Sequence, residues 1–509
     1  MSVPSRVEFS TAARAGADRA FWTGDLTLVA CLAIATVVVH VLSGGKYGFQ
    51  RDELATLEDA RHLAWGYVAY PPVTPFFGRL SLELFGTSLA GFRFFAGVAQ
   101  AMAVVLTALM ARLLGGGRWA QLVAAMAAVP FCLAGGALMQ YVSFDYLCWV
   151  LTAYLTLRQL HSDDPRWWLA VGAAIGCGML SKYSMPFLVA GLVVGVLLTD
   201  ARRYLKSKWL WGGVAVALLI FLPNLIWQAQ HNFVSVDFLR HIHARDVAEG
   251  RHRGFLLGQL KITLFAFPIW VAGLCFYLFS AKRYRTLGWM YAVPLLLFVV
   301  GKGRDYYLAG SYPMLYAAGA VWVEGWLPSR RAGTLRTAIW VALLLDTTIA
   351  AAFFLPLAPI NSAWFKVATQ VNGDFREEIG WPDLVETIAH VRDGLSVDDS
   401  VHLGILGTNY GEAGAVNLYG PRYGLPKAIS GVNSFWQRGY GDPPPQVLIV
   451  VGRSRRFVER NFTGCHLAAH TGNRLGVGNE ETIEHPDIFV CRGPMRGWPE
   501  FWKDFRYYG

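Results

Sequence analysis

The chain has 509 residues, of which 54% are hydrophobic and only 16% charged, and its mean hydropathy is +0.36. Soluble domains carry about 25% charged residues, so this composition excludes an ordinary soluble protein and predicts one embedded in a lipid bilayer. The formal net charge of +10 comes from short basic clusters between apolar stretches. That pattern orients membrane helices and does not indicate a nucleic-acid partner.

Apolar stretches long enough to cross a hydrocarbon core of about 30 Å recur through the first 356 residues. They lie near 26–43, 92–111, 119–138, 143–157, 184–199, 209–228, 255–279, 287–300, 308–326 and 337–356. A further span is expected at 167–180, because the apolar run 167–198 is too long for one helix and is interrupted at Lys182. The sequence therefore predicts an α-helical polytopic membrane protein with about eleven transmembrane helices.

Basic residues gather in alternate loops between these spans. The clusters include Arg202, Arg203, Lys206 and Lys208, then Lys282, Arg283 and Arg285, then Arg330, Arg331 and Arg336. The longer loops 44–91 and 229–254 hold fewer basic residues per position. Because cytoplasmic loops are rich in Lys and Arg, we expect a multi-pass protein of the inner (plasma) membrane, with a cytoplasmic N-terminus and an extracytoplasmic C-terminal region.

The first outer loop, 44–91, places the adjacent acids Asp52 and Glu53 just beyond the first helix. Apolar residues of the segment Glu53–Trp65, such as Leu54 and Leu57, recur on one face, which predicts an amphipathic helix lying in the membrane interface. Asp52 would then be the N-cap of that helix. A purely structural capping role is therefore one interpretation of this carboxylate.

Charged residues, Gly and Pro return from about residue 357, and no later run is long enough to span a membrane. Residues 357–509 are expected to form a soluble α/β domain outside the membrane, with a strand at Gln446–Val451. The stretch 409–441 is dense in aromatic residues, Asn and Gly, which suits either sugar binding or a loop-rich scaffold. Cys465 and Cys491 are expected to form a disulfide here, the alternative being two buried free cysteines.

Several motifs in the membrane region together resemble one enzyme family. The acidic pair at Asp52, the amphipathic segment, the run Tyr70-Pro71-Pro72 and the sequence FGTSLAGFR ending in Arg93 resemble the opening of glycosyltransferase family 39 and aminoarabinose-transferase-like proteins. These are GT-C-fold enzymes related to protein O-mannosyltransferases. The likeness is clearest over 44–110 and continues more loosely at 181–186 and 302–315.

The resemblance implies a GT-C transmembrane catalytic domain over residues 1–356. The implied activity is that of a glycosyltransferase, a hexosyl- or pentosyltransferase, which moves a sugar from a polyprenyl-phosphate carrier to an acceptor hydroxyl with inversion. The donor is the lipid-linked sugar, and no other cofactor is implied. The partners would be membrane lipids, that donor, and a glycan, lipid or protein acceptor.

The resemblance also implies roles for individual residues. Asp52 maps to the catalytic carboxylate, with Glu53 beside it, and would accept the proton of the acceptor hydroxyl. Many relatives have Lys or His where this chain has Tyr70, so phosphate binding must rest on other cations. The candidates for contact with the phosphate or the lipid donor are Arg93, Lys182, Lys302, Arg304, Tyr306, Tyr307 and Tyr70, and Asp145 is a candidate for the acceptor site.

Structural interpretations stand beside these roles. Arg93 can be an interface side chain, Lys182 a simple turn lysine, Asp145 a cap or ion-pair partner, and Tyr306 and Tyr307 part of an aromatic belt. His241, His243 and His252 are spaced poorly for a rigid metal site, so we predict no metal. For the whole protein, a transporter or lipid flippase and a non-catalytic receptor are the alternatives, although the repeats typical of transporters are not evident.

Overall fold

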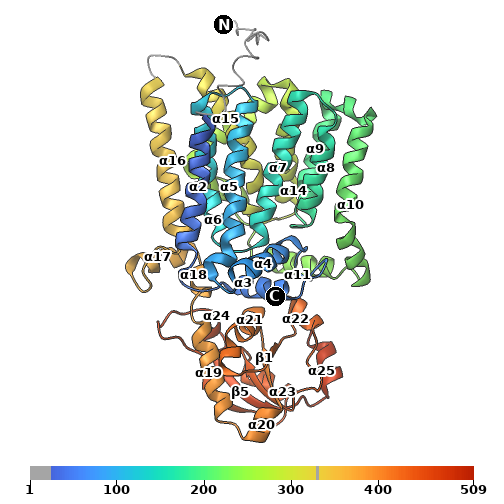
Figure 1. Cartoon of the computed structure of the whole chain (residues 1–509), viewed down its shortest axis with the longest axis vertical. Helices are drawn as coiled ribbons and strands as arrows, with labels where there is room; N and C mark the ends of the chain where they lie inside the picture. The colour runs from blue at the N-terminus through green and yellow to red at the C-terminus, as the bar shows by residue number, and fades with distance from the viewer. Residues whose placement is uncertain (1–24, 328–331) are drawn as a thin grey trace.

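The computed structural model describes residues 25–327 and 332–509. The predicted cytoplasmic N-terminus (1–24) and the basic residues Arg330 and Arg331 lie outside the described residues. Figure 1 shows a bundle of long helices above a smaller region that contains all the strands described here. Short helices lie between the two parts (Figure 1).

Each stretch predicted to span the membrane is helical. The bundle consists of α2 (Asp25–Ser43), α5 (Leu89–Leu113), α6 (Arg118–Gly136), α7 (Tyr141–Ser162), α8 (Trp167–Met179), α9 (Met185–Leu198), α10 (Lys208–Gln230), α14 (Arg285–Val300), α15 (Tyr312–Trp326) and α16 (Ala332–Phe354), together with a run of α12 (Phe255–Thr263), η3 (Leu264–Ala266), α13 (Phe267–Cys275) and η4 (Phe276–Ser280). Short helical turns η2 (Asp200–Lys206), η5 (Lys282–Tyr284) and η6 (Asp305–Ser311) connect them.

Five helical segments of the described chain are long and apolar enough to cross a membrane. They are Leu89–Leu113, Arg118–Gly136, Lys208–Gln230, Phe255–Ser280 and Gly333–Phe354. The pair Met185–Leu198 and Asp200–Lys206, bent by 99°, would make a sixth. These helices confirm a polytopic helical membrane protein, because only elements that satisfy their own backbone hydrogen bonds are stable in lipid.

The predicted break at Lys182 is confirmed. Helix α8 ends at Met179 and α9 begins at Met185, so that Lys182 lies in the turn between them. Pro186 occupies the first turn of α9, where its missing N–H has no helical partner to lose. The turn therefore places Lys182 at one end of two apolar helices, where it lines the same cavity as Tyr410 of the C-terminal region.

Three helices lie between the bundle and the C-terminal region: α3 (Arg51–Arg61), α4 (Val73–Phe85) and α11 (Val234–Ala248) (Figure 1). The prediction that Asp52 caps α3 is wrong, because Gln50 is the N-cap and its side chain accepts a hydrogen bond of 2.6 Å from the Asp52 backbone N–H. The helix also ends at Arg61 and not at Trp65. Its apolar face, with Leu54 and Leu57, packs into protein and not against lipid.

The predicted α/β architecture of the C-terminal region is confirmed by a mixed sheet in the order β2-β1-β3-β5-β4. Strand β1 is parallel to β2 and β3, whereas β5 is antiparallel to β3 and β4. The strands are β1 (Leu403–Gly407), β2 (Ala428–Ile429), β3 (Val447–Val451), β4 (His466–His470) and β5 (Asp487–Arg492). The helices and turns are α17 (Ala363–Val371), α18 (Asp374–Glu377), α19 (Trp381–Asp393), α20 (Val397–Val401), α21 (Tyr410–Tyr419), η7 (Gly420–Tyr423), α22 (Asn433–Gln437), α23 (Arg455–Asn461), α24 (Glu480–Ile483) and α25 (Trp498–Asp504).

The two faces of this sheet belong to different cores. One face packs against α23 and α25, where Leu448 meets Phe501 and Trp502. Residues of the other face, such as Ile405, share a core with Leu54 of α3. Cys465 and Cys491, the pair expected from the sequence, are joined by a disulfide. The sheet is thus fixed on one side to the first loop of the membrane region.

Candidate active site

A cavity of about 480 Å³ lies where the bundle, the short interface helices and the C-terminal region meet. Its wall includes six of the residues proposed from the sequence: Asp52, Tyr70, Lys182, Lys302, Arg304 and Tyr307. These residues are far apart in the chain and come from α3, from the loop before α4, from the turn before α9, and from η6 and the segment before it. Glu53, Arg93, Asp145 and Tyr306 are not on this wall.

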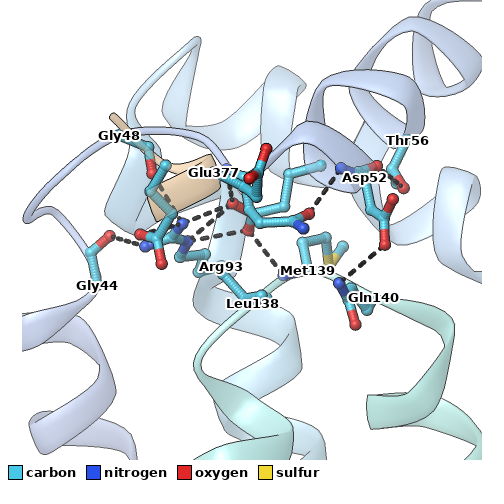
Figure 2. Close-up of polar contacts among 12 residues, drawn as sticks. Gly44, Gly48, Asp52, Thr56, Arg93, Leu138, Met139, Gln140 and Glu377 are labelled. Carbon is cyan, nitrogen blue, oxygen red and sulfur yellow. Dashed lines mark hydrogen bonds and ion pairs between the residues drawn. The ribbon is translucent and has the colours of Figure 1, made fainter. Parts of the chain in front are cut away.

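Asp52 is half-buried and presents its carboxylate to the cavity. One oxygen, Oδ1, accepts a hydrogen bond of 2.7 Å from the Tyr410 hydroxyl, and Oδ2 lies 3.3 Å from the Gln140 amide nitrogen. Figure 2 shows Asp52 directed toward Gln140 and away from Arg93. Oδ1 is therefore held by a short hydrogen bond. Oδ2 has only a long contact and remains open to a ligand in the cavity.

Glu53 is fully buried beside Arg93, so the structure places these two predicted site residues together but away from the cavity wall. Arg93 Nε and NH2 donate to the Glu53 carboxylate at 2.9 and 2.6 Å, and Arg93 also donates to Glu378 and to the Gly44 and Gly48 carbonyls (Figure 2). The Met139 and Gln50 backbone N–H groups complete the shell of Glu53. With these hydrogen bonds formed, the polar groups of Arg93 and Glu53 are engaged with protein groups away from the cavity wall.

Lys182 is enclosed by aromatic rings at the membrane end of the cavity. Its ammonium lies 5.2, 5.3 and 4.4 Å from the ring centres of Tyr141, Tyr306 and Tyr307, within cation–π range. The Asp145 carboxylate is 4.0 Å away and accepts hydrogen bonds of 2.7 Å from Ser184. Burial lowers the pKa of Lys182, and Asp145 opposes that effect. Asp145 therefore lies behind Lys182, in the ion-pair arrangement that was the alternative to an acceptor-site role, and it is not on the cavity wall.

Other basic side chains lie beside Lys182, close to Asp246. Arg304 Nε and NH2 donate to both Asp246 oxygens at 2.6 and 2.7 Å, and Arg251 and Arg245 approach the same carboxylate at 3.6 and 3.9 Å. Lys302 is exposed on the cavity wall, and its side chain makes no hydrogen bond or ion pair with the described residues. Arg251 also binds Glu249 at 2.6 Å. These two acids do not neutralise the three arginines and Lys302, so this side of the cavity keeps an excess of positive charge.

Tyr70 has a polar partner inside the protein. Its hydroxyl donates to Asp59 Oδ2 at 2.6 Å, and Arg438 of the C-terminal region binds the other oxygen of Asp59. Burial raises the pKa of Asp59, while Arg438 and Tyr70 lower it. The Tyr70 ring lies on the cavity wall, but its hydroxyl is already engaged.

The structure adds residues that the sequence did not single out. Gln140 and Tyr410 contact the Asp52 carboxylate, and Asp246 binds Arg304. Asp374 and Glu377 of α18 also line the cavity. Only Tyr410 carried a signal, since it belongs to the aromatic stretch 409–441. In residues 25–327 and 332–509, no group of three or more His, Cys, Asp or Glu could hold a metal ion.

Comparisons with known proteins agree with the predicted resemblance. Residues 69–227 match the family described as dolichyl-phosphate-mannose-protein mannosyltransferase, which confirms that resemblance. The matched residues include Tyr70 and Lys182, whereas Asp52 precedes them.

Two curated relatives show similarity over part of their length. The lipid A galacturonosyltransferase RgtD of Rhizobium johnstonii is 28% identical over 222 residues, which are 42% of this chain and 44% of that protein. An undecaprenyl phosphate-alpha-4-amino-4-deoxy-L-arabinose arabinosyl transferase of Yersinia pestis (strain Pestoides F) is 26% identical over 307 residues, or 54% of this chain and 55% of the relative. The chain thus spans about half the length of these relatives.

The fold resembles that of a solved structure. ArnT from Cupriavidus metallidurans, in the structure bound to undecaprenyl phosphate, has a TM-score of 0.57 to this chain at 16% sequence identity. The likeness covers 92% of this chain and 98% of that one. The apo structure of the same protein gives the same TM-score and covers 97% of that chain. At this identity the likeness establishes an ArnT-like fold.

Proposed function

We propose that this chain is a membrane glycosyltransferase that transfers a sugar from a polyprenyl-phosphate carrier to an acceptor hydroxyl, with inversion at the anomeric carbon. One observation carries the proposal: a single cavity holds the Asp52 carboxylate together with Lys182, Lys302 and Arg304. A carboxylate can accept the proton of a hydroxyl, and fixed cations can bind a departing phosphate. The reaction needs both kinds of group in one site.

In the proposed step, the acceptor oxygen attacks the anomeric carbon while Asp52 Oδ2 takes its proton. The bond between that carbon and the phosphate oxygen breaks, and its electron pair stays on the phosphate. Lys182, Lys302 and Arg304 balance the resulting charge, Arg304 through a geometry suited to phosphate oxygens. The leaving group is a monophosphate, so we expect these cations to suffice and activity to survive chelation of divalent metals with EDTA.

The carrier's lipid chain is proposed to leave the cavity along its apolar wall. Phe187 of α9 and Leu297 and Phe298 of α14 line the cavity close to Lys182 and Lys302. Tyr306 and Tyr307 pack against Lys182 and so hold its ammonium toward the phosphate position. In this arrangement the phosphate lies at the membrane boundary and the prenyl chain remains among bundle helices.

The proposed arrangement in the membrane is a GT-C fold with about eleven transmembrane helices. Loop 44–91 and residues 357–509 lie at the same end of the bundle, as Figure 1 shows. We propose that this end is extracytoplasmic and that the N-terminus is cytoplasmic, in agreement with the basic loops at the opposite end. Residues 1–356 would form the catalytic membrane domain, and residues 357–509 would close the cavity from outside.

The relatives' names suggest the substrates. We propose a lipid-linked amino pentose or hexuronic acid as donor, because the relatives are named as an arabinosyl transferase and a galacturonosyltransferase. We propose undecaprenyl phosphate as carrier, since the ArnT structure was solved with it. Lipid A is the proposed acceptor, the one named for RgtD. These similarities favour an enzyme over a transporter, a flippase or a non-catalytic receptor.

The test is a transfer assay in proteoliposomes. The wild-type protein is supplied with lipid A and with undecaprenyl phosphate carrying labelled 4-amino-4-deoxy-L-arabinose or galacturonic acid. We expect labelled lipid A from one donor, and an Asp52→Asn variant should transfer about 10²–10⁴-fold more slowly, the usual contribution of a general base. If the Asp52→Asn variant transfers sugar at the wild-type rate, Asp52 is not the base. Absence of transfer and of donor hydrolysis with both sugars would contradict the proposed donors.

A further inference from the structure

The C-terminal region and the helix that carries Asp52 are packed together as one unit. Helix α21 lies against α3, and Ala413 and Val416 share a core with Leu54 and Leu57. The contact is close at Gly414, where a Cβ atom would lie 2.8 Å from the Leu54 Cβ. A larger residue would separate the two helices. The position of α21 relative to Asp52 is therefore fixed by close packing.

The first residue of α21 makes direct contact with the proposed base. The Tyr410 hydroxyl donates to Asp52 Oδ1 at 2.7 Å, across 358 positions of sequence. Burial, followed by the nearby Asp52 charge, raises the pKa of Tyr410 well above its usual range. The phenol consequently keeps its proton and remains a donor. The Arg51 guanidinium lies 5.9 Å from the Tyr410 ring centre and helps to hold the ring in place.

We propose that Tyr410 is a positioning residue for the reaction: its hydroxyl fixes Oδ1 of Asp52 so that Oδ2 faces the acceptor. This inference rests on the proposed function. Among the described residues, the only other side chain that hydrogen-bonds to this carboxylate is Gln140, whose amide nitrogen lies 3.3 Å from Oδ2. Without Tyr410 the carboxylate could rotate about its side-chain bonds, and productive orientations would become a minority. The soluble region would then contribute directly to the chemistry of the membrane region.

A purely structural role for this hydroxyl is less well supported, because other contacts already fasten the C-terminal region to the first outer loop and to α5. Arg51 binds Glu480, Arg438 binds Asp59, and Glu378 binds Arg93. The shared apolar core adds to these ion pairs. Loss of one hydroxyl group should leave the two parts attached, and its effect should appear in the rate.

The experiment compares Tyr410→Phe with a matched substitution on the same helix. Tyr419 also lies on α21, but its hydroxyl makes no hydrogen bond to the described residues and it does not line the cavity. We expect Tyr410→Phe to lower kcat about 10- to 100-fold, the range for a lost hydrogen bond to a charged group, with the donor KM within about twofold of wild type. Tyr419→Phe should keep the wild-type kcat.

Combination with Asp52→Asn separates positioning from structure. If Tyr410 acts through Asp52, Tyr410→Phe should cause little further loss of rate in the Asp52→Asn protein. An equal additional loss in both backgrounds would overturn the inference, as would a wild-type kcat for Tyr410→Phe. If Asp52→Asn lowers the rate and Tyr410→Phe does not, this inference alone fails. If Asp52→Asn itself has no effect, the proposed base fails first.

Discussion

Glu53 and Arg93 form a buried ion pair. The Arg93 side chain is 2% exposed and the Glu53 side chain 0%. Asp52, the next residue in the chain, faces the cavity instead. Since successive residues of a helix point about 100° apart, one acidic pair supplies one structural and one chemical carboxylate. The two neighbours should therefore respond differently to neutralisation.

Glu53→Gln is expected to destabilise the protein by about 3 kcal/mol, because it leaves the buried Arg93 charge without its main partner. Asp52→Asn should have little effect on stability, since Gln50 and not Asp52 is the N-cap of α3. Thermal unfolding in detergent micelles measures both. A Glu53→Gln protein as stable as wild type would contradict the structural role of Glu53.

Lys182→Met is expected to weaken binding of undecaprenyl phosphate about 10- to 100-fold, because it removes a charge-assisted contact and keeps most of the side-chain volume. Lys427→Met, at an exposed position of the C-terminal region, should bind as wild type does. Tryptophan fluorescence or calorimetric titration with the carrier gives the two dissociation constants. Equal affinities for both variants would place the phosphate elsewhere.

Glu378 predicts a pH dependence of stability. It is buried and shares Arg93 with Glu53; burial raises the pKa of Glu378 to about 8, with Arg93 opposing and Glu53 adding to the effect. An unfolded Glu has a pKa of about 4.3, so the folded state holds this proton more tightly. The stabilisation is complete below about pH 4 and is lost as the pH rises through about 8.

Melting temperatures should therefore fall between about pH 5 and pH 8 in the wild type, and Glu378→Gln should reduce this slope. Glu386→Gln is the control, because Glu386 pairs with Arg474 at the surface. Parallel pH profiles for wild type and Glu378→Gln would show that Glu378 does not change its protonation in this range.

The disulfide between Cys465 and Cys491 closes a loop of 26 residues. On the chain-entropy estimate, a loop of this length stabilises the folded region by about 3.5 kcal/mol. Alkylation of the native protein should modify these two thiols only after reduction. Free labelling of both without a reductant would rule the bond out in the cell.

Substituted cysteines can test the proposed orientation. Leu63→Cys and Lys427→Cys, both at exposed positions at the α/β end, should react with a membrane-impermeant maleimide in intact cells. Lys206→Cys, in η2 at the opposite end, should react only after the cells are permeabilised. Labelling of residue 206 alone in intact cells would invert the proposed topology.

Much of the fold could be predicted from the sequence because lipid imposes a strict rule on the chain. Apolar runs reveal bundle helices, and even the break at Lys182 follows from length. Contacts between distant segments leave no such local pattern. No sequence pattern around Arg93 indicates that its side chain binds Glu53 and Glu378, because 285 positions separate Arg93 from Glu378. For the same reason Tyr410 could be seen only as one aromatic residue among many.

The core shared by α3 and the sheet limits how the protein can be divided. Leu54 and Leu57 are 0% and 1% exposed, and part of what covers them comes from residues beyond 380. A fragment ending at residue 356 would leave these side chains in water and is expected to aggregate. Chimeras that exchange the C-terminal region between relatives should therefore also exchange the first outer loop. The two segments should therefore be exchanged together, although residues 92–356 lie between them in the chain.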